Sequence, residues 1–462
     1  MYFCIIMTEN RANFGSKLGI ILASAGSAVG LGNVWRFPTE VGANGGAAFI
    51  LLYIACVILL GLPLMVSEFI IGRHTHTNTA DAYRKLAPGT PWVFQGYLGV
   101  FTAWFILCYY AVVSGWTLKY LVSSVLESVT KISDSTAYFV DFTASPFIPI
   151  FYMIAVLMMT HYVIVAGVEK GIERSSKLLM PLLFIIIVVL AVSSFFMPGT
   201  EQGLRFLFQP DFSKIDSGVV LSAMGQAFFS LSIAMGCLCT YASYFRDDAH
   251  LVKTAGSVAS IDTMIAILSG IIIFPAFFSA HGIAPNAGPG LVFITLPNVF
   301  QIAFSNLPWL GEVFAFMFYL LLLLAALTSM ISIHEPATAF IHEHYGLTRP
   351  FSARIVTASA AFFGIFCSLS FGVLKDFTPF FGMCFFDFFD YVSAKIFLPV
   401  GGIIISLFVG WKLDTQLVID ELTNRGKLHV PALFVRGYIF ILRWLAPIAI
   451  VLIFLNELGL FK

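Results

Sequence analysis

Small and polar residues interrupt an apolar stretch near the N-terminus, where a membrane-crossing helix would normally be built from Leu and Ile. The segment 26–38, GSAVGLGNVWRFP, carries Asn33 beside Gly26, Gly30 and Gly32. Glycine lowers the cost of leaving helical geometry, and an opened turn frees carbonyl oxygens, which is tolerated in a membrane only where the backbone is buried or lines a cavity. Freed carbonyls beside an amide oxygen suit a hard, oxygen-seeking cation such as Na⁺. Helix packing through Gly26 and Gly30 is the alternative, but it does not explain Asn33.

A second interruption occurs much later in the chain. The segment 229–236, FSLSIAMG, places two serines and a glycine in the middle of an apolar stretch. Serine hydroxyls can also bond back to an intact helix, so the composition alone leaves the helix unbroken as an alternative. If the first five spans and the next five are repeats, the two interruptions hold matching places, and paired broken segments indicate a transporter's binding site.

Several acidic residues also fall within apolar stretches, where charge is costly and by default indicates function. For Glu68 and Asp387 a structural role is the preferred interpretation, and Thr328 with Ser329 leaves cation ligation and helix–helix bonding equally open. No nucleophile–base constellation, phosphate loop or cofactor motif is present, so the sequence predicts a protein that is not an enzyme. The acidic residues concerned are Glu68, Asp262, Glu335, Asp387 and Asp390.

The composition of the 462-residue chain is that of a polytopic membrane protein, with 59% hydrophobic and 11% charged residues. Soluble domains average about 45–50% apolar residues and about 25% charged residues. The formal net charge of +0 argues against a nucleic-acid partner, and the 7 cysteines make no disulfide framework.

Long apolar stretches predict the membrane-spanning helices, each about 20 residues or longer. The runs lack the alternation of barrel strands, so they indicate an all-α protein with eleven transmembrane helices in a single membrane domain, 1–462. The predicted spans are 16–38, 46–72, 92–125, 146–166, 172–197, 217–245, 254–281, 309–341, 352–373, 380–411 and 432–458.

Orientation follows from the Lys and Arg residues of the loops, most of which fall on the side of the N-terminus. The positive-inside rule then predicts the N-terminus inside and the C-terminus outside. The segment 282–308 is rich in Pro and Gly and has no Lys or Arg. We expect it to be an extracellular lid loop that folds back onto the protein, with a passive connector as the alternative.

A long, ordered set of motifs carries a family resemblance. The motifs are AVGLGNVWRFP (28–38), NGGAAF (44–49), GLPLMVSEFIIGR (61–73), YYAVVSGW (109–116), GQAFFSLS (225–232), TYASYFR (240–246), ALTSMIS (326–332) and DFFDY (387–391). In these segments the chain resembles the neurotransmitter:sodium symporter family, in its bacterial amino-acid transporter branch. The resemblance implies a leucine-transporter-like fold of two inverted five-helix repeats, about 14–197 and 217–411, with an extra helix at 432–458. Many members have a twelfth span, which is not predicted here.

The resemblance implies two sodium sites and a central substrate site. The first sodium site would use Ala28, Asn33, Ser230 and Asp262, and the second Gly26, Val29, Ala325, Thr328 and Ser329. Tyr110 and the freed amides near Gly30 and Gly32 would bind the substrate carboxylate. The rest of the substrate site would be formed by Ser27, Ala28, Ile106, Phe229, Ser230, Ser232, Met235, Ser329 and Ile333.

Three departures from the family pattern bear on specificity. Gly30 stands where monoamine carriers have Asp, which points to α-amino acids, and Met235 stands where several relatives have Phe, which favours a large hydrophobic or aromatic side chain. Asp262 stands where the family has Asn, and Ala266 where some members have Glu. We therefore expect the Asp262 carboxylate to balance the sodium charge without chloride, and to take up a proton when sodium leaves.

Gates are implied at both ends. Arg36 and Asp390 would form the outer pair, and Arg11 with Glu343 the inner pair near Tyr244, where the family more often has Asp than Glu. In the fifth span, Gly171 and Pro181 match a helix-unwinding motif of the family, with an ordinary helix start and kink as the alternative.

These observations predict sodium-coupled import of a neutral, hydrophobic or aromatic L-amino acid by alternating access. The location would be the inner membrane of a bacterium, with the lipid bilayer and the amino acid as partners, two Na⁺ and no chloride, and either a monomer or a dimer. An amino-acid receptor that does not translocate is the main rival. A membrane enzyme and a channel are disfavoured, the first because catalytic motifs are missing and the second because opposed gates suit alternating access.

Overall fold

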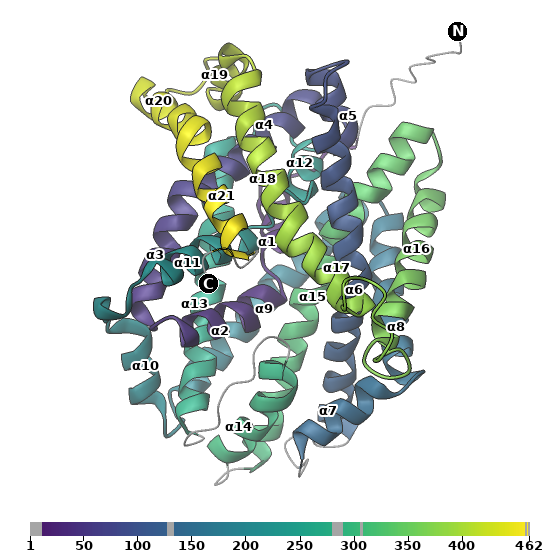
Figure 1. Ribbon diagram of the computed structural model, residues 1–462, viewed down its shortest axis with the longest axis vertical. Helices are drawn as coiled ribbons and strands as arrows, with labels where there is room; N and C mark the ends of the chain where they lie inside the picture. Colours follow the sequence, from purple (N-terminus) through teal and green to yellow (C-terminus); the bar gives the residue numbers. More distant parts are fainter. Residues whose placement is uncertain (1–11, 127–133, 280–289, 305–307, 458–459, 461–462) are drawn as a thin grey trace.

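The computed structural model describes residues 12–126, 134–279, 290–304, 308–457 and 460. Within these residues the protein is a bundle of helices (Figure 1), and its only β feature is an isolated bridge between Phe380 and Met383. The predicted all-helical membrane fold is confirmed.

The helices of the first half follow one another along the chain with short connections. In order they are α1 (Lys17–Ala28), η1 (Gly32–Arg36), α2 (Phe37–Ala43), α3 (Ala47–Cys56), η2 (Val57–Gly61), α4 (Leu62–Thr75), α5 (Thr79–Leu86), α6 (Val93–Leu126), α7 (Ser135–Ala144), α8 (Ile148–Val165), η4 (Val168–Glu173), α9 (Arg174–Ser194), α10 (Thr200–Phe208) and η5 (Phe212–Lys214).

The second half repeats the pattern of long helices joined by short ones. Its elements are α11 (Ser217–Ser230), α12 (Cys237–Ala242), α13 (Leu251–Ser279), η6 (Leu291–Thr295), α14 (Leu296–Ala303), α15 (Pro308–Tyr345), α16 (Arg349–Leu369), α17 (Phe385–Asp390), η7 (Tyr391–Phe397), α18 (Leu398–Leu407), η8 (Phe408–Lys412), α19 (Thr415–Leu422), α20 (Ala432–Phe440), η9 (Ile441–Leu445) and α21 (Ala446–Glu457).

Nine helices in the described ranges are long and apolar enough to cross a membrane, and each overlaps one of the predicted spans. The predicted first span is instead a pair, Lys17–Ala28 and Gly32–Ala43, bent by 55° at the break between them. The predicted sixth span is divided into α11 and α12, with non-helical backbone between them. The total of eleven spans and the orientation of the termini remain predictions.

Large apolar side chains on the outer helices face away from the bundle. Phe151, Tyr162 and Leu178 are each about two-thirds exposed, and only a third of the most apolar window of α8 is buried. A water-soluble monomer does not expose a continuous apolar surface of this kind, so this surface contacts lipid.

Polar side chains begin several of the helices. Ser16 accepts a hydrogen bond from the Gly19 amide at 3.0 Å to start α1, and Asp216 accepts one from Val219 at 2.8 Å to start α11. Such caps satisfy amides that have no partner within the helix. Both helices that later break are therefore anchored at their first turns.

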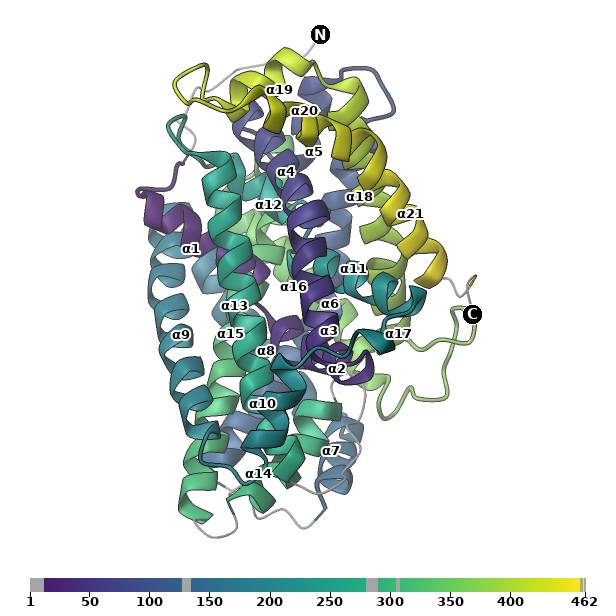
Figure 2. The same ribbon diagram turned by 90° about the vertical axis from the view of Figure 1, so that its left-hand side faces the viewer.

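The two broken segments lie inside the bundle. Helix α1 packs against α9, α12, α13 and α15, while α11 contacts η1 and α2 beyond the first break. One end of the bundle carries α5 and α19, and the opposite end carries α7 and α14 (Figure 2). The breaks are thus surrounded by helices that supply side chains from distant parts of the sequence.

The described part of the predicted lid loop, 290–304, is helical and packed. It forms η6 and α14, and Phe293 is fully buried. Tyr120 donates a hydrogen bond to the Phe293 carbonyl at 2.9 Å, and Tyr319 donates to that of Val292 at 3.1 Å. The remaining residues of the predicted loop lie outside the described ranges, and its action as a lid remains a prediction.

Candidate substrate and cation site

The first break follows α1, at a point where the backbone passes very close to neighbouring side chains. The helix ends at Ala28, and Val29 takes an extended conformation with ψ 110. A Cβ added to Gly30 would lie 2.6 Å from Ser329 Oγ and 3.1 Å from the Tyr110 hydroxyl, and one on Gly32 would lie 3.0 Å from the Phe229 ring. A larger residue at either position would have to displace a side chain of the predicted substrate site.

The second break is a short run of left-handed backbone between α11 and α12. Ser232, Ala234 and Gly236 have φ values of 53, 67 and 71. For residues other than glycine this conformation costs about 1–3 kcal/mol each and persists only where surrounding contacts enforce it. Residues held in such backbone cluster at functional sites, so this segment is a candidate functional element.

Hydrogen bonds from outside the break hold it in place. The Glu68 carboxylate accepts from the Ala234 amide at 2.6 Å and from the Cys239 amide at 3.3 Å. The Ser232 hydroxyl donates to the Ser27 carbonyl at 2.8 Å, which links the two breaks directly. Glu68 thus satisfies amides that the broken helix leaves without partners, in agreement with a structural role.

Three residues of the predicted first sodium site meet at these breaks. Asn33 Nδ2 donates to Asp262 Oδ1 at 2.7 Å and to Ser230 Oγ at 3.2 Å. The Ser230 hydroxyl donates to Asp262 Oδ2 at 2.8 Å. Ala28 is the last residue of α1 at the same break. Asn33 Oδ1 also accepts from the Gly30 amide at 2.9 Å, so the same side chain stabilises the open turn.

Tyr53 is a member of this cluster that sequence reasoning missed. Its hydroxyl donates to Asp262 Oδ2 at 3.1 Å and contacts Ser230 Oγ at 3.3 Å. Tyr53 lies on α3, more than two hundred residues from Asp262, inside an ordinary apolar run. No pattern in the sequence could have distinguished it from a core tyrosine.

Asp262 is the electrostatic centre of the cluster. It is 0% exposed, and within the described ranges its carboxylate has hydroxyl and amide donors but no basic partner. A buried carboxylate without a compensating charge is costly. The Asp262 carboxylate with the Ser230 and Tyr53 hydroxyl oxygens supplies negative charge and oxygen atoms of the kind that a small monovalent cation binds.

The residues of the predicted second sodium site also come together, between α1 and α15. The Ser329 hydroxyl donates to the Val29 carbonyl at 3.0 Å, and the Thr328 hydroxyl donates to the Ala325 carbonyl at 3.0 Å. A Cβ on Gly26 would lie 3.3 Å from Thr328 Cβ. Carbonyl and hydroxyl oxygens from two helices therefore meet at the end of α1.

The predicted substrate residues surround the same breaks. The Tyr110 hydroxyl accepts from the Leu31 amide at 3.1 Å, next to Gly30. Ile106, Met235 and Ile333 are buried and belong to one apolar cluster. A polar end formed by the Tyr110 hydroxyl and the backbone of the break, beside apolar side chains, suits a zwitterion with a hydrophobic side chain.

The two residues of the predicted outer gate are not paired with each other. The Arg36 guanidinium lies over the Phe229 ring at 4.4 Å, and Asp390 is exposed. Within the described ranges no ion pair joins Arg36 to Asp390. The two predicted gate residues are therefore separate in this conformation, and their action as a gate remains a prediction.

The opposite end is closed by an aromatic residue that the sequence reasoning did not select. Phe14 is 1% exposed, and its ring packs edge-on against Tyr241 and Tyr244. Its amide donates to the Tyr244 carbonyl at 3.0 Å. Phe14 therefore packs between these tyrosines and blocks the bundle at the end that carries α5.

The predicted inner-gate residues have definite partners at this end. Arg11 lies outside the described residues. Glu343 accepts from the Asn78 amide at 2.7 Å, and the Tyr244 hydroxyl donates to Glu335 at 2.7 Å. Glu335 is fully buried and pairs with Arg349 at 2.6 Å. These contacts join the N-cap of α5, the segment after α12 and the start of α16 to α15.

The fifth predicted span is helical throughout its two parts, η4 and α9. Gly171 lies against the preceding helix, since a Cβ there would be 2.0 Å from the Val163 carbonyl oxygen. Pro181 lies within α9. In this conformation, close packing explains why glycine rather than a larger residue occupies position 171. The helix-unwinding role of Gly171 and Pro181 remains a prediction.

Comparison with known proteins places this geometry in a family. The model of the sodium:neurotransmitter symporter family matches residues 11–140 and 148–462. An uncharacterized sodium-dependent transporter of Bacillus subtilis, YhdH, is 36% identical over 98% of this chain and 99% of its own. The mouse sodium- and chloride-dependent GABA transporter 2 is 26% identical over 90% of this chain and 75% of its own.

A solved structure shares the fold. The crystal structure of MhsT in complex with L-phenylalanine aligns with a TM-score of 0.87 and 42% identity, covering 97% of this chain and 100% of that one. The relatives are transporters rather than enzymes. The chain belongs to the sodium:neurotransmitter symporter family and is a sodium-dependent transporter.

Proposed function

We propose that the protein imports a neutral, hydrophobic or aromatic L-amino acid together with Na⁺, without chloride, across the cell membrane of a bacterium. The observation that carries the proposal is the fully buried Asp262 carboxylate, held by Asn33, Ser230 and Tyr53 between two facing helix breaks. A cation there is balanced by the protein itself, so an added anion is not needed. The L-phenylalanine in the MhsT structure supports an amino acid as substrate.

The cycle would begin from the described conformation. Arg36 lies over Phe229 and is not paired with Asp390, whereas Phe14 is buried against Tyr241 and Tyr244, and this arrangement supports an outward-facing starting state. Binding of Na⁺ and the amino acid would draw Arg36 toward Asp390 above the site. Opening of the Phe14 end would then release both, since a ligand shifts a two-state equilibrium toward the state that binds it better.

Proteoliposome uptake tests transport directly. With radiolabelled L-phenylalanine outside, an inward Na⁺ gradient should drive accumulation that K⁺ cannot support. Entry of one net positive charge adds about 2.3 kcal/mol per 100 mV, so an inside-negative potential should raise uptake. Binding that depends on Na⁺ without any accumulation would favour the receptor that we consider the main rival.

Replacement of chloride by gluconate tests the role of Asp262. Uptake should be unchanged, because the carboxylate already supplies the negative charge beside the cation. Loss of most uptake in gluconate would refute chloride independence while leaving sodium coupling intact. Dependence of uptake on internal pH would report the predicted proton on Asp262 during the return step.

Tyr53→Phe should weaken sodium binding. The hydroxyl stabilises the ionised carboxylate, and hydrogen bonds to charged groups contribute about 1.5–3 kcal/mol, so the Na⁺ concentration for half-maximal substrate binding should rise about tenfold. Tyr120→Phe is the matched control, because that buried hydroxyl donates to the Phe293 carbonyl instead. Equal sodium dependence in both variants would show that Tyr53 does not act on the cation site.

A further inference from the structure

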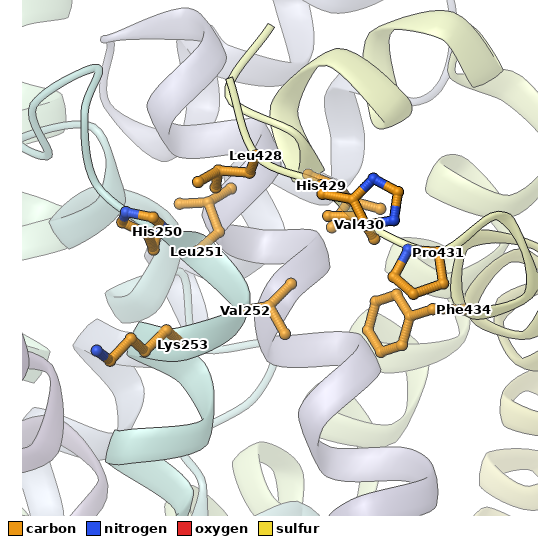
Figure 3. A pocket seen from close by; sticks show the side chains of 10 residues that line it. His250, Leu251, Val252, Lys253, Leu428, His429, Val430, Pro431 and Phe434 are labelled. Carbon is orange, nitrogen blue, oxygen red and sulfur yellow. The ribbon is translucent and has the colours of Figure 1, made fainter. Parts of the chain in front are cut away.

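A groove opens on the lipid-facing surface where α13 begins. It lies between the first turn of α13 and the segment that connects α19 to α20, with a volume of about 380 Å³. Figure 3 shows His250 and Lys253 on the α13 side, and His429, Pro431 and Phe434 across from them.

The groove continues along the outer surface of α4 and α13, toward the midpoints of these membrane-spanning helices. A second cavity of about 310 Å³ shares Val252 and Phe434 with the first. A third, of about 420 Å³, shares Ile58 and Leu62 with the second. We call this continuous depression, bounded by η2 and α4, α13 and α20, the α4–α13–α20 groove.

The two ends of the groove differ in chemistry. Its first part is lined by His250, Lys253 and His429 and by no acidic residue. Lys253 is exposed and makes no ion pair within the described part of the chain. The apolar spans that flank the groove begin at Leu251 and Ala432, so these basic groups lie at the depth of lipid headgroups.

The basic end is preformed because a buried network holds it. Arg73 donates from Nε to Glu421 at 2.6 Å and from Nη1 to Asn424 at 2.8 Å. Arg73 also donates to the Ala249 carbonyl at 2.5 Å. One guanidinium therefore joins the residue before His250 to the segment that leads to His429.

The rest of the groove is apolar and has open space. Ile58 is 55% exposed and Phe434 is 44% exposed. A Cβ added at Gly437 or Gly256, which line the second and third parts, would meet nothing within 4 Å. A long apolar channel that ends at basic groups matches the shape and charge of a membrane lipid.

We propose that the α4–α13–α20 groove binds a phospholipid with an anionic headgroup, whose phosphate lies between Lys253 and His429 and whose acyl chains lie along α13. The acyl chains would pack on Ser260, Thr263 and Met264. That stretch of α13 also carries Asp262, which points into the bundle and is fully buried. The lipid would therefore cover the outer face of the helix segment that carries a proposed sodium ligand.

Lipid titration of the purified, delipidated protein in detergent, followed by native mass spectrometry, tests the proposal. Dioleoylphosphatidylglycerol should bind more tightly than dioleoylphosphatidylcholine. Lys253→Gln should weaken phosphatidylglycerol about fivefold, the effect of one basic group near a membrane surface, and leave phosphatidylcholine unchanged. Gly437→Phe should weaken both lipids, because the ring would fill the acyl channel.

Lys427→Gln is the matched control, since Lys427 is exposed on the same segment but does not line the groove. Its lipid affinities should equal those of the unmodified protein. Equal affinity for the two lipids, an equal loss in Lys427→Gln, or full competition by soluble glycerol 3-phosphate would each overturn the proposal. Unchanged unfolding temperatures of Lys253→Gln and Gly437→Phe in lipid-free detergent confirm that the variants are folded.

Discussion

Asp262→Asn is expected to abolish sodium-dependent substrate binding at ordinary sodium concentrations. Asparagine has nearly the same shape, but it removes the negative charge that would balance the proposed cation in a fully buried site. Loss of one partner of a buried charge pair costs about 3–5 kcal/mol, so the apparent sodium affinity should fall at least a hundredfold. Equilibrium binding of radiolabelled L-phenylalanine across a sodium titration measures the loss directly.

A double variant separates charge from shape. Asp262→Asn combined with Ala266→Glu moves the carboxylate one helical turn along α13, to the same face. If negative charge is what the site requires, this variant should recover part of the sodium-dependent binding. Sodium dependence that is unaltered in Asp262→Asn alone would show that Asp262 does not face the cation.

Glu68→Ala is expected to have the second large effect, through the structure of the broken segment. The Ala234 and Cys239 amides would lose their acceptor in a buried, strained backbone. Each unsatisfied buried group costs about 1–3 kcal/mol, so the segment should refold toward a continuous helix and substrate binding should disappear. The unfolding temperature in detergent should fall as well.

Two further variants test whether the effect of Glu68→Ala comes from the loss of a hydrogen-bond acceptor. Glu68→Gln keeps an acceptor of similar shape and should retain part of the binding. Glu201→Ala removes a carboxylate that is 87% exposed at the surface and should change neither binding nor stability. Wild-type behaviour of Glu68→Ala would mean that other contacts hold the break.

Local composition was sufficient to predict most of the helices and the places where two of them break. A run of about 20 apolar residues is unstable in water and must lie in lipid, so the spans could be predicted without knowledge of their neighbours. The glycines at 30 and 32 and the serines at 230 and 232 marked the breaks, because such residues weaken a helix within a few residues of themselves. The predicted ligands Asn33, Ser230 and Asp262 were named through the family resemblance, and the structure brings them into contact.

The tertiary structure alone decided which side chains enforce the breaks and close the ends. Tyr53 reaches Asp262 from α3, Glu68 reaches Ala234 from α4, and Phe14 closes the bundle beneath Tyr244. In the sequence Tyr53 and Phe14 have no distinguishing pattern, and Glu68 stands out as an acidic residue without any indication of which amides it binds. Their roles depend on partners more than a hundred and fifty residues away, and such contacts arise only when packing places separate helices side by side.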